Sequence, residues 1–128
     1  MFHAGEPPAE VSDAYAVLVE AQEAGVRAAT VGTPCSEVDA AARRVINAAG
    51  LGEFFVHRVG HGIGQEAHED PYMVNGNDLP LSPGHAFSVE PGIYFEGRFG
   101  MRLEDIVVAT NQGPLRLNEA PRDLAPVG

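Results

Sequence analysis

Residues Phe87 to Thr110 read FSVEPGIYFEGRFGMRLEDIVVAT, and this stretch indicates a sheet of short strands. Apolar and β-branched residues predict strands at 85–89, 93–95 and 100–110. The tripeptide Glu90-Pro91-Gly92 turns the chain between the first two strands. Upstream, Phe54–Val56 is predicted to open another strand, which the glycines between Gly60 and Gly64 interrupt.

The first half of the chain is predicted to be helical. Apolar residues recur at three- and four-residue steps on one face of each of two helices: Val11, Tyr15, Leu18, Val19, Val26 and Ala29 in the first, and Val38, Ala41, Ala42, Val45, Ile46 and Ala49 in the second. Gly32 ends the first helix, and Thr33 then serves as an N-cap with Pro34 at the first helical position. Two alanine-rich helices followed by several strands predict an α+β fold in which the helices pack on a sheet.

The composition limits the class of protein. A chain of 128 residues is expected to form a single domain, residues 1–128. Its net charge of −10 disfavours binding to nucleic acid or to an anionic membrane surface. No apolar run approaches the ~20 residues that span a bilayer. The lone Cys35 cannot form an internal disulfide, so we expect a cytoplasmic protein.

Residues that suit a metal centre lie in the second half. Three of the five histidines are close together in the chain, at His57, His61 and His68. Imidazole together with carboxylate suits Zn, Mn, Co or Fe(II). The glycines around His61 let backbone or substrate approach closely, and Arg102 and Glu104 are expected on one face of one strand. Each feature alone has an ordinary structural explanation, such as a turn or a surface ion pair, but together they indicate a site.

Two segments carry a family resemblance: HRVGHGIGQEAHEDPY at 57–72 and the stretch at 87–110. They closely resemble the metallopeptidase family that includes Xaa-Pro dipeptidase (prolidase), aminopeptidase P and methionine aminopeptidase. Glu90 follows His61 by 29 positions and Glu104 follows Glu90 by 14, in the family's order, and EPGIY resembles the proline-directed branch. The resemblance implies a partial pita-bread (creatinase/aminopeptidase-like) fold, with two helices packed on an antiparallel-rich sheet.

The resemblance also implies roles for individual residues. His61, Glu90 and Glu104 would be ligands in a centre of two divalent ions, Mn²⁺ or Co²⁺ by preference and Zn²⁺ as the other choice. Glu90 would in addition act as general base and then as proton donor. His68 would contact the scissile carbonyl, His57 would line the substrate side, and Arg102 would orient the carboxylates. The substrate would be a short peptide with proline, either an Xaa-Pro dipeptide or a chain cleaved before proline.

The family's two aspartate ligands lie on an earlier hairpin that does not occur in this sequence. Asp13 and Asp39 are the only aspartates before His61, and both are expected on helix surfaces. We therefore expect a truncated chain, the C-terminal portion of the catalytic domain, without the upstream half and the N-terminal domain. We expect this chain to bind metal weakly. We also expect an exposed sheet edge, which a homodimer or another association would cover.

Two alternatives to an active peptidase remain. The chain could be a non-catalytic peptide- or protein-binding module on the same fold, since loss of the aspartates is what such a change would produce. It could also be a metal-free hydrolase of the creatinase type, although the intact Glu90 and Glu104 weigh against this. Assay of a proline dipeptide with and without a chelator separates the alternatives.

Overall fold

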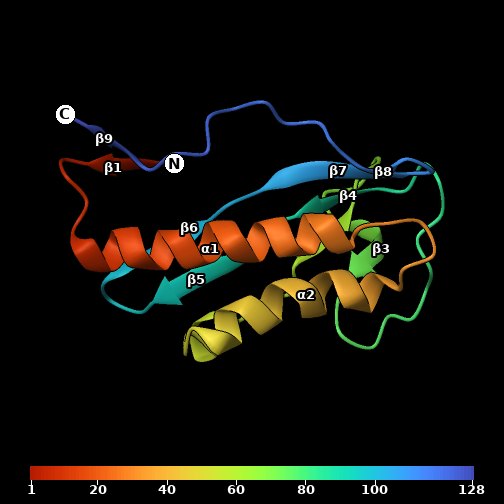
Figure 1. Cartoon of the computed structure of the whole chain (residues 1–128), viewed down its shortest axis with the longest axis horizontal. Coiled ribbons are helices and arrows are strands. Elements are labelled where there is room, and N and C mark those ends of the chain that lie inside the picture. Colours follow the sequence, from red (N-terminus) through yellow and green to blue (C-terminus); the bar gives the residue numbers. More distant parts are fainter.

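Two long helices form the first half of the chain. The structure is a computed structural model that describes all 128 residues. Helix α1 spans Ala9–Ala28 and α2 spans Cys35–Ala48, and Figure 1 shows them side by side. The two predicted helices are therefore confirmed, but the predicted N-cap is wrong. Pro34 precedes α2 as its N-cap without a capping side chain, because the Thr33 hydroxyl instead pairs with the Thr30 hydroxyl at 2.7 Å.

The strands form one main sheet and two small ones. The main sheet is antiparallel throughout, in the order β3-β2-β4-β7-β8. Its strands are β2 (Gly60–Gly62), β3 (Glu69–Met73), β4 (Ala86–Val89), β7 (Asp105–Thr110) and β8 (Gly113–Arg116). A hairpin pairs β5 (Gly92–Phe95) with β6 (Phe99–Arg102), and β1 (Phe2–Ala4) pairs in parallel with β9 (Ala125–Val127). This is the predicted α+β architecture, with two helices on an antiparallel-rich sheet.

A single hydrophobic core joins the helices to the sheet. Helix α1 packs on α2 and also contacts β4, β5, β6 and β8, while α2 contacts β3. The fully buried side chains include Leu18 and Ile46 from the helices and Phe87 and Val107 from the sheet. Helix α1 therefore supports β4, the strand that leads directly to Glu90. Neither helix is both long and apolar enough to cross a bilayer.

The segment from residue 52 to residue 62 differs from the prediction. A short 3-10 helix, η1 (Gly52–Phe54), replaces the strand expected at Phe54–Val56. The buried Phe55 ring packs under the Arg43 guanidinium at 4.1 Å, so its apolar character reflects burial in a turn. Glycine does not interrupt the strand but forms it: Gly60 passes so close to β4 that an added Cβ would lie 1.8 Å from the Ser88 carbonyl oxygen.

The single strand predicted at 100–110 is divided into two strands in the structure. β6 ends at Arg102 and β7 begins at Asp105, with Leu103 and Glu104 between them. The chain changes sheet here, because β6 pairs with β5 while β7 pairs with β4 and β8. The expectation that Arg102 and Glu104 share a face of one strand is therefore wrong, since Glu104 lies in the connection.

Candidate active site

A small polar cavity holds most of the residues that the sequence singled out. It measures about 240 Å³ and is lined entirely by polar and charged side chains: His57, Arg58, His61, His68, Glu90 and Arg102. Three larger surface pockets, of about 450, 440 and 390 Å³, contain no histidine. The smallest of the four cavities is therefore the one in which imidazole and carboxylate groups come together.

His61 and Glu90 face each other inside this cavity. His61 lies in β2 and Glu90 directly follows β4, and the His61 Nε2 atom is 3.0 Å from Glu90 Oε1. Their side chains are only 12% and 10% exposed. The His61 Nδ1 atom lies 2.9 Å from the Gly62 carbonyl, which can only accept, so Nδ1 carries a proton. In a neutral imidazole, Nε2 then points its lone pair at a carboxylate oxygen, and only a proton or a metal cation between them stabilises that contact.

Both oxygens of Glu90 are held by neighbouring side chains. Ser88 Oγ donates a hydrogen bond to Glu90 Oε1 at 2.8 Å and accepts one from the His61 backbone amide at 3.0 Å. Arg102 Nη1 donates to Glu90 Oε2 at 3.1 Å. The buried Ser88 hydroxyl thus links the two facing residues. Ser88 was not predicted as a site residue, although its place two positions before Glu90 puts both side chains on one face of the chain.

A second chain of hydrogen bonds runs along the side of the cavity through Tyr94. Arg102 Nε donates to the Tyr94 hydroxyl at 2.8 Å, and that hydroxyl lies 3.2 Å from His57 Nε2. His57 Nδ1 donates to the Arg58 carbonyl at 2.7 Å, so the hydroxyl proton of Tyr94 is directed to His57. The hydrogen bond with Tyr94 is the main cause that raises the pKa of Arg102, and Glu90 adds to it. Tyr94 was also missed, since no local pattern relates it to either partner.

His68 lines the cavity, and Glu104 does not. The His68 ring stands edge-on to the His61 ring, with centroids 4.6 Å apart. Glu104 is outside the set of residues that line the cavity. Partial burial raises the pKa of the Glu104 carboxyl, and the charge of Glu90 raises it further, while His61 and Arg102 act in the opposite direction. Glu104 is therefore electrostatically coupled to Glu90 and His61 without lining the same cavity.

The donor groups can be compared with the needs of a divalent cation. A nitrogen lone pair on His61, with the other ring nitrogen bonded to a backbone carbonyl, is the usual arrangement of a histidine ligand. Glu90 supplies the adjacent carboxylate. These two residues fit a divalent ion, but no group of three His, Cys, Asp or Glu side chains in this chain is arranged to hold one. The chain thus supplies two donor groups of the kind that bind a divalent ion.

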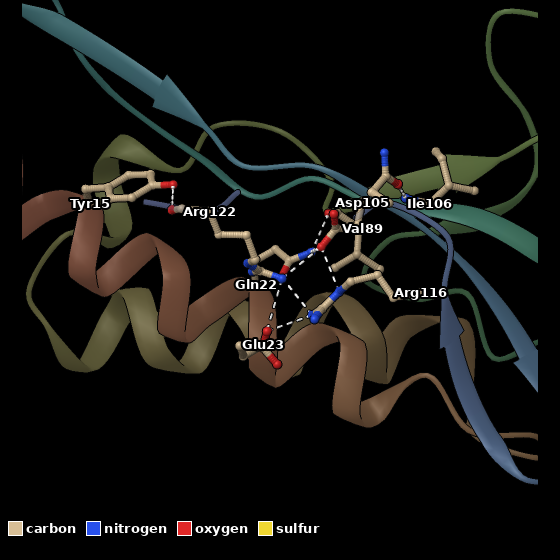
Figure 2. A network of polar contacts seen from close by, with 9 residues as sticks. Tyr15, Gln22, Glu23, Val89, Asp105, Ile106, Arg116 and Arg122 are labelled. Carbon is tan, nitrogen blue, oxygen red and sulfur yellow. Dashed lines mark hydrogen bonds and ion pairs between the residues drawn. The ribbon is translucent and has the colours of Figure 1, made fainter. Parts of the chain in front are cut away.

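A buried network fixes the strand ends that carry the candidate carboxylates. Figure 2 shows Gln22 of α1 among Glu23, Asp105, Arg116 and Arg122. Arg122 Nη1 lies 2.9 Å from Asp105 Oδ2, and Arg116 Nε lies 2.8 Å from the same oxygen as an ion pair without a hydrogen bond. Asp105 directly follows Glu104, so its attachment to two arginines holds the start of β7.

A second buried pair holds the segment that leads to His57 and His61. Asp39 is 1% exposed, so the expectation that it lies on a helix surface is wrong, whereas Asp13 is exposed as expected. Asp39 pairs with Arg43 at 2.8 Å and accepts a hydrogen bond from the Val59 amide. Arg43 also donates to the carbonyls of Phe55 and His57. Asp39 faces inward because it anchors this irregular segment, which a helical periodicity cannot reveal.

Comparison with known proteins identifies a family. The sequence model of metallopeptidase family M24 matches residues 1–111 of this chain. A probable dipeptidase PepE of Mycobacterium tuberculosis is 54% identical over 120 residues, which are 94% of this chain and 32% of that protein. An Xaa-Pro dipeptidase of Lactobacillus delbrueckii subsp. lactis is 50% identical over 109 residues, or 85% of this chain and 30% of that protein.

Solved structures agree with these sequence relatives. Dipeptidase PepE from Mycobacterium ulcerans superposes with a TM-score of 0.95 at 53% identity, covering 98% of this chain and 34% of that chain. A recombinant prolidase from Thermococcus sibiricus superposes with a TM-score of 0.94 at 44% identity, covering 97% of this chain and 34% of that one. The chain thus spans about a third of the length of the relatives it matches.

Proposed function

The chain belongs to metallopeptidase family M24, and on that premise we propose that it forms part of a two-metal peptidase centre that cleaves Xaa-Pro dipeptides. The observation that carries this proposal is the 3.0 Å contact between His61 Nε2 and Glu90 Oε1 inside a polar cavity. The names of the relatives, probable dipeptidase and Xaa-Pro dipeptidase, support the substrate class. Cleavage of the residue before proline in a longer peptide is the related possibility.

His61, Glu90 and Glu104 are the residues that would hold the divalent ions, for which we propose Mn²⁺ or Co²⁺ rather than Zn²⁺. Such ions, when bound, polarise the peptide carbonyl and lower the pKa of a shared water. Glu90 would accept the proton of that water and later donate it to the leaving amine. Arg102 supports this role because it is hydrogen-bonded to Glu90 Oε2 and keeps the carboxylate oriented.

His68 and His57 complete the proposed machinery. His68 lines the cavity edge-on to His61 and would donate a hydrogen bond to the scissile carbonyl as negative charge develops there. His57 would line the substrate side, where Tyr94 fixes its ring.

We also propose a cellular location, a place within the catalytic domain and an assembly for this chain. We place it in the cytoplasm, because Cys35 is a free, buried thiol. We take the chain to be the C-terminal portion of a catalytic domain, for which the absence of a third ligand beside His61 and Glu90 is the supporting observation. The outer strands β3 and β8 each leave one edge unpaired, and a homodimer or a similar association would cover such an edge.

A second candidate is a non-catalytic peptide-binding module on the same fold. The incomplete donor set favours it, because a chain without a three-ligand cluster binds a metal ion weakly. A metal-free hydrolase of the creatinase type is the third, and the paired His61 and Glu90 weigh against it.

One assay distinguishes the three functions. Hydrolysis of alanyl-proline is measured with Mn²⁺, and again with excess chelator, for the unchanged chain, for Glu90→Gln and for the exposed control Glu66→Gln. A metal peptidase hydrolyses the dipeptide only with Mn²⁺, loses activity in Glu90→Gln and keeps it in Glu66→Gln. Hydrolysis that persists with chelator indicates the metal-free enzyme, and saturable peptide binding without hydrolysis indicates the binding module.

A further inference from the structure

Asn75 is the only asparagine in this chain that precedes a glycine. The residues that follow the five asparagines are Ala48, Gly76, Asp78, Gln112 and Glu119. An asparagine side chain can react with the main-chain nitrogen of the next residue, and glycine leaves that nitrogen most accessible because it has no Cβ. The pair Asn75-Gly76 therefore differs chemically from the other four asparagine positions.

Asn75 and Gly76 are the two central residues of an exposed turn that follows β3. The Asn77 amide donates to the Val74 carbonyl at 3.2 Å and closes the turn. Gly76 has φ +85° whereas Asn75 has a negative φ, which is the pattern of a type II turn. A Cβ added to Gly76 would meet no atom within 4 Å, so the space beside its main chain is open.

Neither of the two groups that would react is held by a hydrogen bond. The Gly76 main-chain nitrogen has no acceptor, and the exposed Asn75 side chain has no partner. Asn77 provides the contrast within the same segment. Its side-chain nitrogen donates to the Tyr72 carbonyl at 2.7 Å, and its side-chain oxygen accepts from the Leu79 amide at 3.2 Å. The side chain of Asn77 is therefore anchored at both ends of its amide, whereas that of Asn75 is free to rotate.

We propose that Asn75 is a site of spontaneous deamidation. The Gly76 main-chain nitrogen attacks the side-chain carbonyl carbon of Asn75, and the new C–N bond closes a succinimide ring. The C–N bond to the side-chain nitrogen breaks, and that nitrogen leaves as ammonia with the proton that the Gly76 nitrogen gives up. Water then opens the ring at either carbonyl, which yields aspartate or isoaspartate at position 75. In both products a carboxylate replaces the neutral amide.

Isoaspartate has a structural consequence here because the residues that follow the turn cap helix α2. Pro34 precedes α2 without a capping side chain, so main-chain carbonyls satisfy the first free amides of the helix. The Cys35 amide donates to the Leu79 carbonyl at 2.9 Å, and the Ser36 amide donates to the Asn77 carbonyl at 2.8 Å. Isoaspartate adds a methylene to the main chain between β3 and these two carbonyls. We therefore expect it to displace the caps of α2 and to lower stability.

Ageing of the full chain in solution tests the modification. The purified protein is incubated at physiological temperature in mildly alkaline buffer, and peptide mapping by mass spectrometry follows each asparagine with time. We expect Asn75 to convert at least about tenfold faster than Asn77, which corresponds to about 1.4 kcal/mol in activation free energy. Labelling by an isoaspartyl methyltransferase distinguishes isoaspartate from aspartate.

Two variants test the roles of the reacting groups. Asn75→Gln would have to close a larger ring and should remain unmodified over the same period. Gly76→Ala should react more slowly than the unchanged chain, because its Cβ crowds the attacking nitrogen. If Gly76→Ala does not fold, Asn75→Gln still provides the comparison, since it leaves the main chain of the turn unchanged.

Melting temperatures separate the effect of the new charge from that of the longer main chain. Asn75→Asp introduces the carboxylate without the additional methylene, so it should melt at the temperature of the fresh, unchanged chain. The aged chain that contains isoaspartate should melt a few degrees lower.

Several results would overturn the proposal. Conversion of Asn75 no faster than that of Asn77 would do so, as would modification of Asn75→Gln at the rate of the unchanged chain. An aged chain that contains isoaspartate but melts like the fresh chain would refute the connection with the caps of α2.

Discussion

Gln22 and Asp105 are joined by a hydrogen bond of 2.9 Å from the Gln22 side-chain nitrogen to Asp105 Oδ2, although they are 83 positions apart. The same nitrogen donates to the Val89 carbonyl at 3.3 Å. Val89 and Asp105 are opposite each other in the β4–β7 register. Val89 precedes Glu90 and Asp105 follows Glu104, so one fully buried amide of α1 ties together the strand ends from which both candidate carboxylates emerge (Figure 2).

Replacing Gln22 by methionine is expected to lower the free energy of unfolding by about 1–3 kcal/mol. Methionine has a similar length but cannot donate to Asp105 or accept from Arg122, so those buried groups lose a partner. Urea denaturation followed by circular dichroism measures the change. Gln65→Met, at an exposed position, is the matched control and should remain within about 0.5 kcal/mol. Equal stability of the two variants would contradict this role of Gln22.

Two acidic residues of α2 should differ in their contribution to stability. Asp39→Ala is expected to cost about 2–4 kcal/mol, because it leaves Arg43 and the Val59 amide without their buried acceptor. Glu37→Ala removes an exposed ion pair with Arg44 and should cost about 1 kcal/mol or less. Both variants are compared by thermal unfolding at one pH and ionic strength. A similar loss in both would mean that Asp39 does not anchor the segment before β2.

Glycine is required at position 60 for a steric reason. Gly60→Ala would place a Cβ 1.8 Å from the Ser88 carbonyl oxygen, so β2 must separate from β4. We expect a loss of about 3 kcal/mol or more, or failure to fold. Gly76→Ala is the comparison, since Gly76 has φ +85° and open space around it, and should cost only about 1–2 kcal/mol. Melting temperatures measure both, and a Gly60→Ala chain as stable as Gly76→Ala would refute the close approach.

Stability should fall at alkaline pH partly because of Cys35. Burial raises the pKa of the Cys35 thiol above its ordinary value. A raised folded pKa means that the unfolded chain releases the proton first, so this stabilisation is full below the unfolded pKa of about 8.5 and is lost as the pH rises through the folded pKa. Unfolding of the unchanged chain and of Cys35→Ala is therefore compared at pH 7 and pH 10.5. The stability difference between them should shift in favour of Cys35→Ala at high pH, and a constant difference would disprove the effect.

Much of the fold could be predicted from local patterns. Apolar spacing located both helices, and short apolar runs located β4 and β5, because each depends on residues that are neighbours in sequence. The errors occurred where burial came from distant contacts. Phe55 looked like part of a strand but packs under Arg43, and the run at 100–110 concealed a change of sheet between β6 and β7.

The candidate site was likewise predicted only in part from the sequence. Residue types and order in the sequence were sufficient to select His57, His61, His68, Glu90, Glu104 and Arg102 and to suggest the peptidase family. The tertiary structure alone decided that five of these line one cavity while Glu104 does not, and that Ser88, Tyr94 and Arg58 belong beside them. The reason is physical: chemical identity and periodicity are written along the chain, but hydrogen bonds between residues 27 or 83 positions apart exist only after the core brings their strands and helices together.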